Sequence, residues 1–220
     1  MNIVLRGAVF DFDGVIVDSH PAHKRAWKKF LASVGRETSE EELQFVLDGR
    51  KRDDILRHFL GEMDHETMVE YGRRKERLFR QEATNVQTVH GLVTFLESLE
   101  DGKLALGIAS SGSRRRVELL LGRLGLEKHF QVVVTGDEVA RGKPDPALFF
   151  KAAEGLQMLP SELMVFEDAL SGVMAAKAAG MACVGIAEPD RASILLNAGA
   201  DYVAPDFQSL SYLRLQEILS

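Results

Sequence analysis

Short apolar runs alternate along this chain with amphipathic stretches, and this alternation restricts the possible fold more than any other feature. The runs are rich in Val, Ile, Leu and Phe, as expected for strands that are buried on both faces of a parallel sheet. The pattern therefore predicts an α/β protein with a parallel sheet flanked by helices. The candidate strands are 5–10, 104–109, 132–135, 163–166 and 183–186, with a weaker one at 202–203. Helical patterns follow most of them, at 114–123, 146–156, 171–179 and 191–198.

One stretch breaks the alternation. Residues 19–86 contain helical patterns, two of them at 51–60 and 65–81, and no convincing strand. A segment of this length can bury a small core of its own. The sequence therefore predicts a core made of residues 1–18 and 87–220, with a helical insert at 19–86.

The composition is that of an ordinary globular protein with a net negative charge. The formal net charge of −6 and the pI of about 5.6 argue against nucleic acid as a partner, because nucleic-acid binding needs a surplus of Lys and Arg. The single cysteine, Cys183, excludes an intrachain disulfide, and nothing points to an oxidising compartment. No apolar segment approaches membrane-spanning length. We expect a cytoplasmic protein, monomeric or weakly dimeric, with no membrane partner.

Polar groups stand where four of the candidate strands end, at the edge where doubly wound sheets bind ligands. A single acidic residue at a strand end is commonly a turn former or a helix cap, so each group alone is weak evidence. Four such groups on four strands of one sheet are harder to explain in that way. They are Asp11 with Asp13, Ser110 with Ser111, Lys143 in the loop after the third strand, and Glu167 with Asp168.

The acidic members of this set predict a metal site. Asp11 and Asp13 are two residues apart, so in an extended chain their side chains project to the same side. Gly14, which follows them, permits a tight turn or the close approach of a ligand. Several carboxylates at one point repel each other unless a cation lies among them. Oxygen ligands without Cys or His nearby favour a hard cation, so Mg²⁺ is preferred to zinc.

Together these groups could transfer a phosphoryl group. A bound Mg²⁺ would neutralise phosphate charge and let the Asp11 carboxylate attack phosphorus. Lys143 supplies a second positive charge, and the Ser110 hydroxyl with local backbone N–H groups can hold phosphate oxygens. Asp13 remains as the acid that protonates the leaving oxygen and the base that later activates water.

The segments that contain these residues resemble the motifs of the haloacid dehalogenase superfamily. The resemblance runs from about Gly7 to Ile186, so it covers most of the chain, and as a set its motifs are highly specific. The four motifs match in order and spacing: Asp11-Phe-Asp13-Gly14-Val, Ile-Ala-Ser110-Ser, Gly-Lys143-Pro-Asp-Pro and Val-Phe-Glu167-Asp168-Ala-Leu-Ser-Gly172.

The resemblance implies a fold and a set of roles. It implies a Rossmann-like core, with residues 19–86 as a four-helix cap inserted after the first motif. It also implies that Asp11 forms an aspartyl-phosphate and that Asp13 is the acid and base. Ser110 and Lys143 would hold the phosphoryl group.

The same resemblance implies a Mg²⁺ cofactor. Its ligands would be Asp11, the backbone carbonyl of Asp13, and Asp168, with Glu167 assisting through water. The dehalogenases of the superfamily attack carbon, need no metal and lack the second aspartate. Asp13 and Asp168 therefore favour chemistry at phosphorus.

Within the superfamily, the cap is expected to select the substrate. The segment Asp18-Ser-His20-Pro-Ala-His23-Lys-Arg-Ala-Trp27 resembles the branch that contains β-phosphoglucomutase and related sugar phosphatases. By position, His23 falls on a hinge histidine that assists proton transfer in the mutase. Gly49 and Arg52 fall on the specificity loop, where the arginine grips a distal phosphate, and Lys75 falls on a lysine that contacts the sugar. The resemblance thus implies a small phosphorylated metabolite as the partner of this site.

Two other features have simpler structural interpretations. Trp27 lies with Phe30 and Leu31 on one amphipathic stripe, so it is expected in the core of the cap. The arginine run 114–116 begins the helix after the second motif. A solvated first turn is the favoured interpretation of this run, although one arginine could meet a phosphate there.

Three departures from the mutase pattern bear on the outcome of the reaction. The specificity loop lacks the Ser that usually precedes the arginine, and Ala169 stands where the branch commonly has Ser. The segment Ser111-Gly-Ser-Arg114 replaces a Lys-Asn pair that helps to hold the sugar phosphate. We therefore favour a phosphatase of sugar phosphates, with Ser111 among its substrate-binding residues, over a phosphohexomutase of the β-phosphoglucomutase type.

A non-enzymatic alternative uses the same kind of residues. Receiver domains also group carboxylates and a lysine at the edge of a parallel sheet, where they accept a phosphoryl group as a switch. They have no helical insert after the first strand, whereas this chain has about 65 residues there. This alternative is therefore the least favoured.

Overall fold

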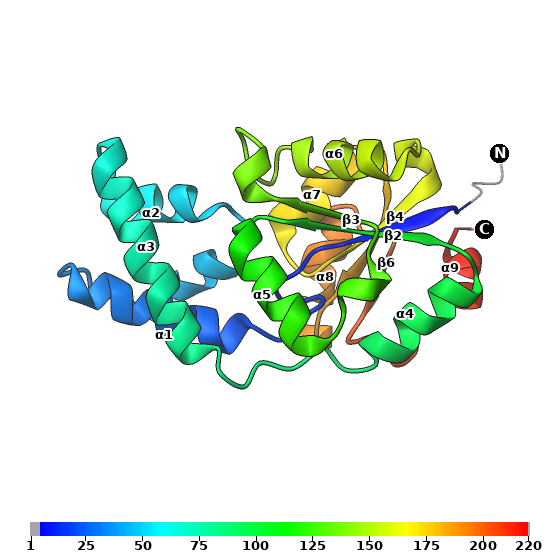
Figure 1. Cartoon of the computed structure of the whole chain (residues 1–220), viewed down its shortest axis with the longest axis horizontal. Coiled ribbons are helices and arrows are strands. Elements are labelled where there is room, and N and C mark those ends of the chain that lie inside the picture. Colours follow the sequence, from blue (N-terminus) through cyan, green and yellow to red (C-terminus); the bar gives the residue numbers. More distant parts are fainter. Residues whose placement is uncertain (1–4, 220) are drawn as a thin grey trace.

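A computed structural model describes residues 5–219 and shows a sheet of six parallel strands covered by helices (Figure 1). The strand order is β3-β2-β1-β4-β5-β6. This arrangement confirms the α/β, Rossmann-like fold that was expected. The strands are β1 (Gly7–Phe10), β2 (Ala105–Ser110), β3 (Val132–Thr135), β4 (Leu163–Glu167), β5 (Ala182–Ile186) and β6 (Tyr202–Ala204).

The first strand occupies the middle of the sheet. Residue Phe10 of β1 pairs with Ile108 of β2 on one side and with Phe166 of β4 on the other. Because all three strands are parallel, their carboxyl ends meet at one edge. The residues that follow β1, β2 and β4 therefore lie side by side although they are far apart in the sequence.

Two hydrophobic layers hold the sheet between its helices. Alternate residues of each strand face opposite layers, as Phe10 and Val9 of β1 do. The Phe10 layer includes a set of stacked and edge-on aromatic rings contributed by Phe95, Phe166 and Phe207. Its helices are α4 (Leu92–Asp101), α5 (Arg114–Leu124) and α9 (Tyr212–Ile218), and those of the Val9 layer are α6 (Ala147–Leu156), α7 (Leu170–Ala178) and α8 (Pro189–Asn197).

Helices α4 and α9 are additions to the helices that the sequence pattern predicts. The buried residues of α4 are Leu92, Phe95, Leu96 and Leu99, at i, i+3, i+4 and i+7. This spacing is the normal signature of an amphipathic helix, so the signal for α4 is present in the sequence. Helix α9 has only seven residues, of which Leu215 is buried, and offers too short a pattern to recognise.

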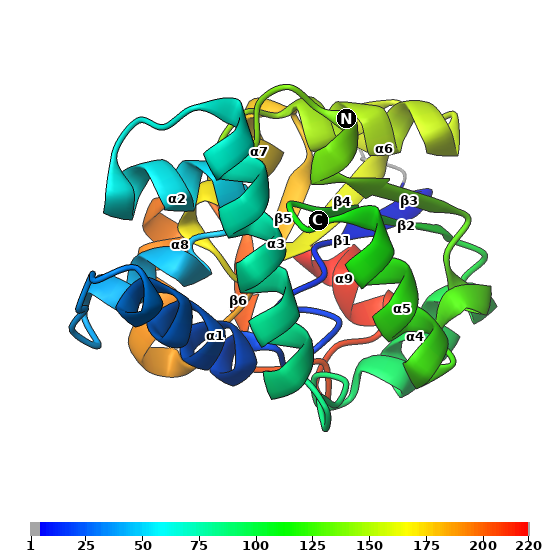
Figure 2. The same cartoon turned by 60° about the vertical axis from the view of Figure 1, so that its left-hand side comes forward.

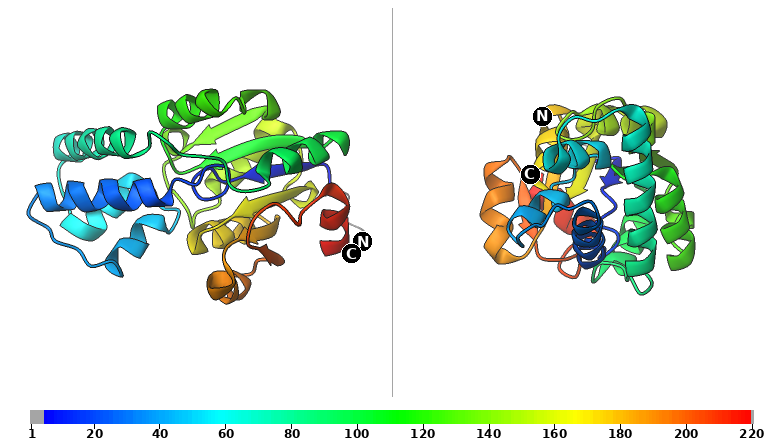
Figure 3. Two further views of the ribbon diagram at one scale, coloured as in Figure 1. Left: turned by 90° about the horizontal axis from the view of Figure 1, so that it is seen from below. Right: turned by 90° about the vertical axis from the view of Figure 1, so that its left-hand side faces the viewer.

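Residues 19–86 contain helices and no strand of the sheet, as predicted. Of the four helices that the resemblance implies, three are α-helices, α1 (His20–Ser33), α2 (Arg52–Leu60) and α3 (His65–Glu82). The fourth is only a short 3-10 helix, η1 (Glu42–Leu47). Figures 1 and 3 show these helices gathered at one end of the molecule, beyond the sheet. They bury a hydrophobic cluster of their own, and the predicted core position of Trp27 is confirmed because its side chain lies in this cluster.

Two neighbouring stretches of chain join this helical end to the sheet. The Asp18 backbone N–H donates to the carbonyl of Gln87 at 2.9 Å, and Val17 forms an antiparallel bridge with Thr88. Figure 2, in which α1 and α3 come forward, shows both helices in front of the carboxyl edge of the sheet. None of the helices in residues 5–219 is both long enough and apolar enough to cross a lipid bilayer.

Candidate active site

The end of β1 carries a buried carboxylate that is tied to a buried lysine. Asp11 is only 5% exposed, and the Lys143 ammonium donates to its carboxylate. The same ammonium donates to Glu167 at the end of β4 and to the Ala109 carbonyl of β2. Lys143 thus joins three neighbouring strands at one point. The structure brings together the residues of the first, third and fourth motifs as the sequence predicts.

Burial and charge determine the protonation of this cluster. Burial opposes the charged form of Lys143, but the carboxylates of Asp11 and Glu167 outweigh it and raise the pKa of the lysine. Burial also raises the pKa of Asp11 well above its usual range, and the opposing charge of Lys143 does not outweigh burial together with repulsion from the nearby carboxylates. The pKa of Glu167 is raised for the same reasons. One ammonium therefore does not balance the carboxylates gathered around it.

Three of these carboxylates are close enough to share one ion. Oxygens of Asp11, Glu167 and Asp168 lie within 4.8 Å of one another, and all three residues are buried. The second oxygen of Glu167 accepts hydrogen bonds from the backbone N–H groups of Asp168 and Ala169 at 2.9 and 3.0 Å. Both oxygens of Glu167 are therefore held, one by Lys143 and the other by the backbone, so Glu167 is suited to orienting Lys143.

The turn after β1 brings the backbone very close to this cluster. Gly14 has φ +83°, in the left-handed region that favours glycine. A Cβ atom there would lie 2.5 Å from an Asp168 oxygen and 2.5 Å from the His20 ring. The tight turn predicted at Gly14 is thus confirmed, and the close approach of a ligand stays a prediction. His20 itself lies 3.0 Å from the Asp168 carboxylate, which raises the pKa of the histidine against the opposing effect of burial.

Asp13 is bonded to residues outside the three-carboxylate cluster. One of its oxygens accepts from the Ser19 hydroxyl at 2.6 Å and lies 3.0 Å from His23 Nε2. The other oxygen accepts from Arg116 Nη2 at 2.6 Å. Burial opposes ionisation of Asp13, but Arg116 and His23 outweigh burial and hold the pKa of this carboxyl well below its usual range. The side chain is held as an anion at the boundary between the sheet and the helical end.

The two serines that follow β2 have different partners. Ser110 is buried, and its hydroxyl accepts from the Gly112 backbone N–H at 3.0 Å. Ser111 lines the pocket, and its hydroxyl donates to the Gly49 carbonyl at 2.6 Å. The sequence predicts both residues at the edge of the sheet, and the structure shows that only Ser111 reaches the helical end.

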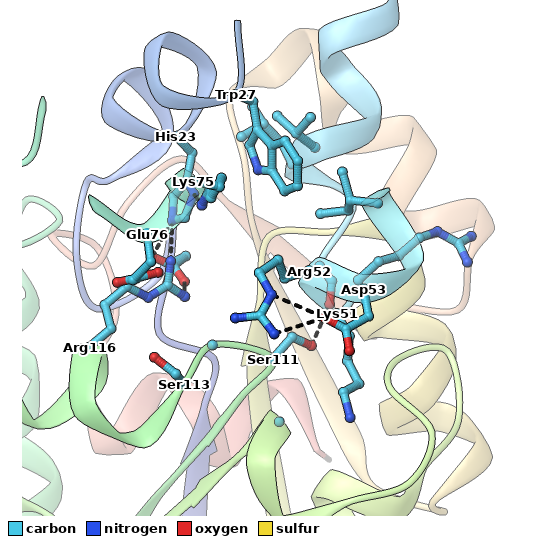
Figure 4. Close-up of a pocket in the computed structure, with 18 of the residues that line it drawn as sticks. His23, Trp27, Lys51, Arg52, Asp53, Lys75, Glu76, Ser111, Ser113 and Arg116 are labelled. Atoms are coloured by element: carbon cyan, nitrogen blue, oxygen red, sulfur yellow. Dashed lines mark hydrogen bonds and ion pairs between the residues drawn. The ribbon is translucent and has the colours of Figure 1, made fainter. Parts of the chain in front are cut away.

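A pocket lies between the edge of the sheet and the helices of residues 19–86 (Figure 4). His23 and Lys75 both line it, and Lys75 Nζ lies 3.0 Å from His23 Nδ1. The Lys75 ammonium also lies 5.1 Å from the ring centres of Trp27 and Phe79. Burial first, and Arg116 second, lower the pKa of Lys75 to about 7. Lys75 is therefore a buried part of the site and not a solvated helix residue.

Arg52 enters the pocket from the start of α2. Its guanidinium is bonded to Asp53 at 2.9 and 3.0 Å and lies against Gly72 of α3, where a Cβ atom would be 2.5 Å from the guanidinium carbon. In Figure 4, Arg52 lies above Ser111 and away from the pair formed by His23 and Lys75. The pocket thus has two cationic regions, one at Arg52 and one at Lys75 with Arg116.

The loop before α2 is bonded directly to the core. The Gly49 carbonyl accepts from Ser111, the Asp48 carbonyl accepts from the Ser171 hydroxyl, and Lys51 donates to the Val139 carbonyl at 2.8 Å. These contacts seat residues 48–51 over the edge of the sheet. They close one side of the pocket.

Replacing Gly49 by Ala should reduce turnover with little effect on folding. Gly49 has φ +70°, and a Cβ atom would lie 3.0 Å from Ala169 Cβ and 3.2 Å from Ser171 Oγ, so the loop would have to lift off the core. We expect kcat/KM to fall about tenfold, which corresponds to about 1.4 kcal/mol of activation free energy. Steady-state kinetics and a thermal melt measure the two effects.

The matched control for this variant is Gly35→Ala. Gly35 also has a positive φ, +81°, but its Cβ atom would meet nothing within 4 Å. Both variants carry the backbone penalty of roughly 1 kcal/mol, and only Gly49→Ala should also lose activity. Equal kinetics for the two variants would show that the contact of Gly49 with the core is unimportant.

Arg116 is the site residue that the sequence interpretation misses. The first turn of α5 was expected to be solvated, and this is wrong for Arg116, which is 7% exposed and contacts Asp13 and His23. The expectation holds for Arg115, which is exposed, while Arg114 is bonded to Glu138 at 2.6 Å. The available signal was helical spacing, since Arg116 precedes the buried Val117 and Leu120 on the inner face of α5.

Comparison with known proteins identifies the family. Residues 8–186 match the family model described as haloacid dehalogenase-like hydrolase. The chain belongs to this family, which confirms the resemblance seen in its motifs. Because this is a family of hydrolases, its match favours an enzyme over the non-enzymatic receiver domain.

Two curated relatives match almost the whole chain. The validoxylamine A 7'-phosphate phosphatase of Streptomyces hygroscopicus is 31% identical over 218 residues, which cover 93% of this chain and 95% of that protein. The β-phosphoglucomutase of Mycobacterium bovis is 34% identical over 243 residues, with coverage of 94% and 91%. The relatives therefore include both a phosphatase and a mutase.

A solved structure confirms the fold over the same length. The crystal structure of β-phosphoglucomutase from Clostridium difficile superimposes with a TM-score of 0.88, covering 98% of this chain and 97% of that one. Sequence identity is 23%, so this likeness concerns the fold alone.

Proposed function

We propose that this protein is a Mg²⁺-dependent phosphatase that hydrolyses a small sugar phosphate through an aspartyl-phosphate on Asp11. The observation that carries the proposal is the arrangement at the end of β1. There Asp11 is held by Lys143 beside two further buried carboxylates, at the floor of a pocket that also contains Asp13. The phosphatases among the relatives support the same reaction class.

The donor atoms of the carboxylate cluster suit a hard divalent cation. Asp11, Glu167 and Asp168 supply only oxygen, and their burial raises the pKa of Asp11 and Glu167, as expected where a further positive charge belongs. We propose that Asp11 and Asp168 hold Mg²⁺, with the Asp13 backbone carbonyl as a further ligand and Glu167 assisting through water. Bound there, Mg²⁺ would supply charge neutralisation to the phosphate oxygens.

The proposed reaction has two steps, and Asp13 transfers a proton in each of them. Asp13 is an anion in the free protein, so for the first step it must take up a proton as the substrate binds. An Asp11 oxygen then attacks phosphorus, the bond from phosphorus to the leaving oxygen breaks, and Asp13 gives that oxygen its proton. In the second, Asp13 takes a proton from water as the water oxygen attacks phosphorus, and the bond from phosphorus to Asp11 breaks. Lys143, Ser110 and backbone N–H groups near Ser110 hold the phosphoryl oxygens.

Residues 19–86 act in this proposal as a cap over the pocket. His23, Gly49, Arg52 and Lys75 belong to the cap, and Ser111 of the core meets it through the Gly49 carbonyl. These five residues would surround the part of the substrate that leaves with the hydroxyl group. A cap seated in this way excludes bulk water and selects the leaving group.

A phosphohexomutase is the second candidate function. It uses the same aspartyl-phosphate but passes the group to a second sugar hydroxyl. The buried pair of His23 and Lys75, together with Arg52 in the pocket, favours this candidate, and so does the mutase among the relatives. The choice depends on whether water or a sugar hydroxyl reaches the phosphorylated Asp11 first.

A phosphate-release assay run beside a mutase assay tests both candidates on one preparation. With Mg²⁺ present, we expect phosphate release from at least one member of a panel of sugar phosphates, and we expect a chelator to abolish it. We expect conversion of β-glucose 1-phosphate to glucose 6-phosphate, with a bisphosphate primer, to be slower than phosphate release. Faster conversion would establish the mutase, and full activity in the chelator would contradict the metal site.

A further inference from the structure

Arg116 connects the acid/base carboxylate to the cap. Its Nη2 donates to Asp13 at 2.6 Å, and its Nη1 lies 2.7 Å from His23 Nε2. The guanidinium carbon lies 5.0 Å from the ring centre of Phe79 in α3. In Figure 4, Arg116 reaches from α5 toward His23 and Lys75. An arginine of the core thus contacts two helices of the cap and one catalytic carboxylate of the core.

These contacts fix Asp13 from two sides. One carboxylate oxygen is bonded to Ser19 and lies near His23, at the start of α1, and the other is bonded to Arg116 of α5. Both oxygens are held at once only when the start of α1 and Arg116 of α5 both reach Asp13. The position of Asp13 therefore depends on how the cap sits on the core.

The site is shaped for an arginine at this position. A guanidinium is planar and can direct two N–H groups at two partners, which the single ammonium of a lysine does less well. Gly112 leaves the necessary room, because a Cβ atom there would lie 2.1 Å from Arg116 Nη2. Burying a cation is costly unless it is paired, and Asp13 supplies the pairing charge. Arg114 and Arg115, its neighbours in sequence, make none of these contacts.

We propose that Arg116 is a positioning residue that sets the orientation of Asp13 and makes it depend on the seating of the cap. The inference rests on the proposed function, in which Asp13 protonates the leaving oxygen. Arg116 acts through Asp13 and need not touch the reacting phosphoryl group. Its loss should therefore matter most for substrates whose leaving oxygen requires a proton.

The test compares two leaving groups. Arg116→Met, Asp13→Asn and the double variant are assayed for kcat/KM with para-nitrophenyl phosphate and with the best hexose phosphate of the panel. This quantity reports the steps up to departure of the leaving group, and nitrophenolate departs without needing a proton. For the hexose phosphate we expect Arg116→Met to lower kcat/KM by about 10- to 100-fold, and for the aryl phosphate by less than about threefold.

The double variant distinguishes positioning from substrate binding. If Arg116 acts through Asp13, removing it in the Asp13→Asn background causes little further loss. Equal losses for both substrates, or full additivity with Asp13→Asn, would overturn the inference. Arg116→Lys, which keeps the charge, should recover part of the hexose phosphate activity. This variant keeps the test open if Arg116→Met folds poorly.

Arg115→Met is the matched control, since Arg115 is exposed on the same turn of α5. It should change neither substrate's kcat/KM. The two proposals fail in different ways. A wild-type protein that releases phosphate from neither substrate overturns the proposed function and the inference with it. Phosphate release with additive or substrate-independent losses at Arg116 overturns the inference alone.

Discussion

Replacing Asp11 by Asn is expected to lower phosphate release by about 10⁴-fold or more, because the amide cannot attack phosphorus. Asn has nearly the same shape, so the fold should be retained. The side chain is buried and bonded to Lys143, and no other carboxylate of the described chain occupies its place at the end of β1. Phosphate release with Mg²⁺ measures the loss, and circular dichroism checks the fold.

The control for this variant is Asp190→Asn, which makes the same chemical change at an exposed position in α8. It should leave the rate unchanged. Substantial turnover in Asp11→Asn would remove the nucleophile from the proposal. Another residue would then have to accept the phosphoryl group, or water would have to attack the substrate directly.

Replacing Lys143 by Met should have the second-largest effect, and it should reduce both stability and activity. The change leaves Asp11 and Glu167 buried with no ammonium between them. Removing one partner of a buried ion pair costs about 3–5 kcal/mol of unfolding free energy. Mg²⁺ should restore part of this loss, since it would bind among the same carboxylates in the folded state only. Denaturant unfolding with chelator and with Mg²⁺ measures the loss of stability and its partial recovery, and phosphate release measures the loss of activity.

Two further variants support the interpretation of Lys143→Met. Lys151→Met changes an exposed lysine of α6 and should leave the unfolding free energy nearly unchanged. The double variant Lys143→Met with Glu167→Gln removes both charges and should be more stable than Lys143→Met alone. If Mg²⁺ stabilised wild type and Lys143→Met equally, the metal and Lys143 would not share the same carboxylates.

Much of the core could be predicted because its signals are local. Each strand is a short apolar run, and residues such as Asp11, Ser110 and Glu167 stand at the carboxyl ends of those runs. In a parallel sheet these ends meet at one edge whatever the strand order is. The chemical type of each residue and its place at a strand end are therefore enough to assemble the floor of the site.

The partners of individual side chains were not predictable in the same way. Arg116 and Asp13 are 103 residues apart, and helical spacing, which can mark Arg116 as the inward arginine of its run, does not indicate its partner. The pairing of Lys75 with His23 links α3 to α1 across 52 residues. Each pairing depends on the relative placement of two helices, which is fixed by the packing of many other residues.

By itself, the sequence determined that Asp11 follows a buried strand, that the other groups of the proposed phosphoryl-transfer site also stand at strand ends, and that a helical segment follows. These conclusions need only the period of the apolar pattern and the chemistry of each residue. Only the tertiary structure decided that Asp13 turns toward the cap and that Arg116 holds it there. The reason is that a side chain's charge is local information, whereas its partner is chosen by the way distant elements pack.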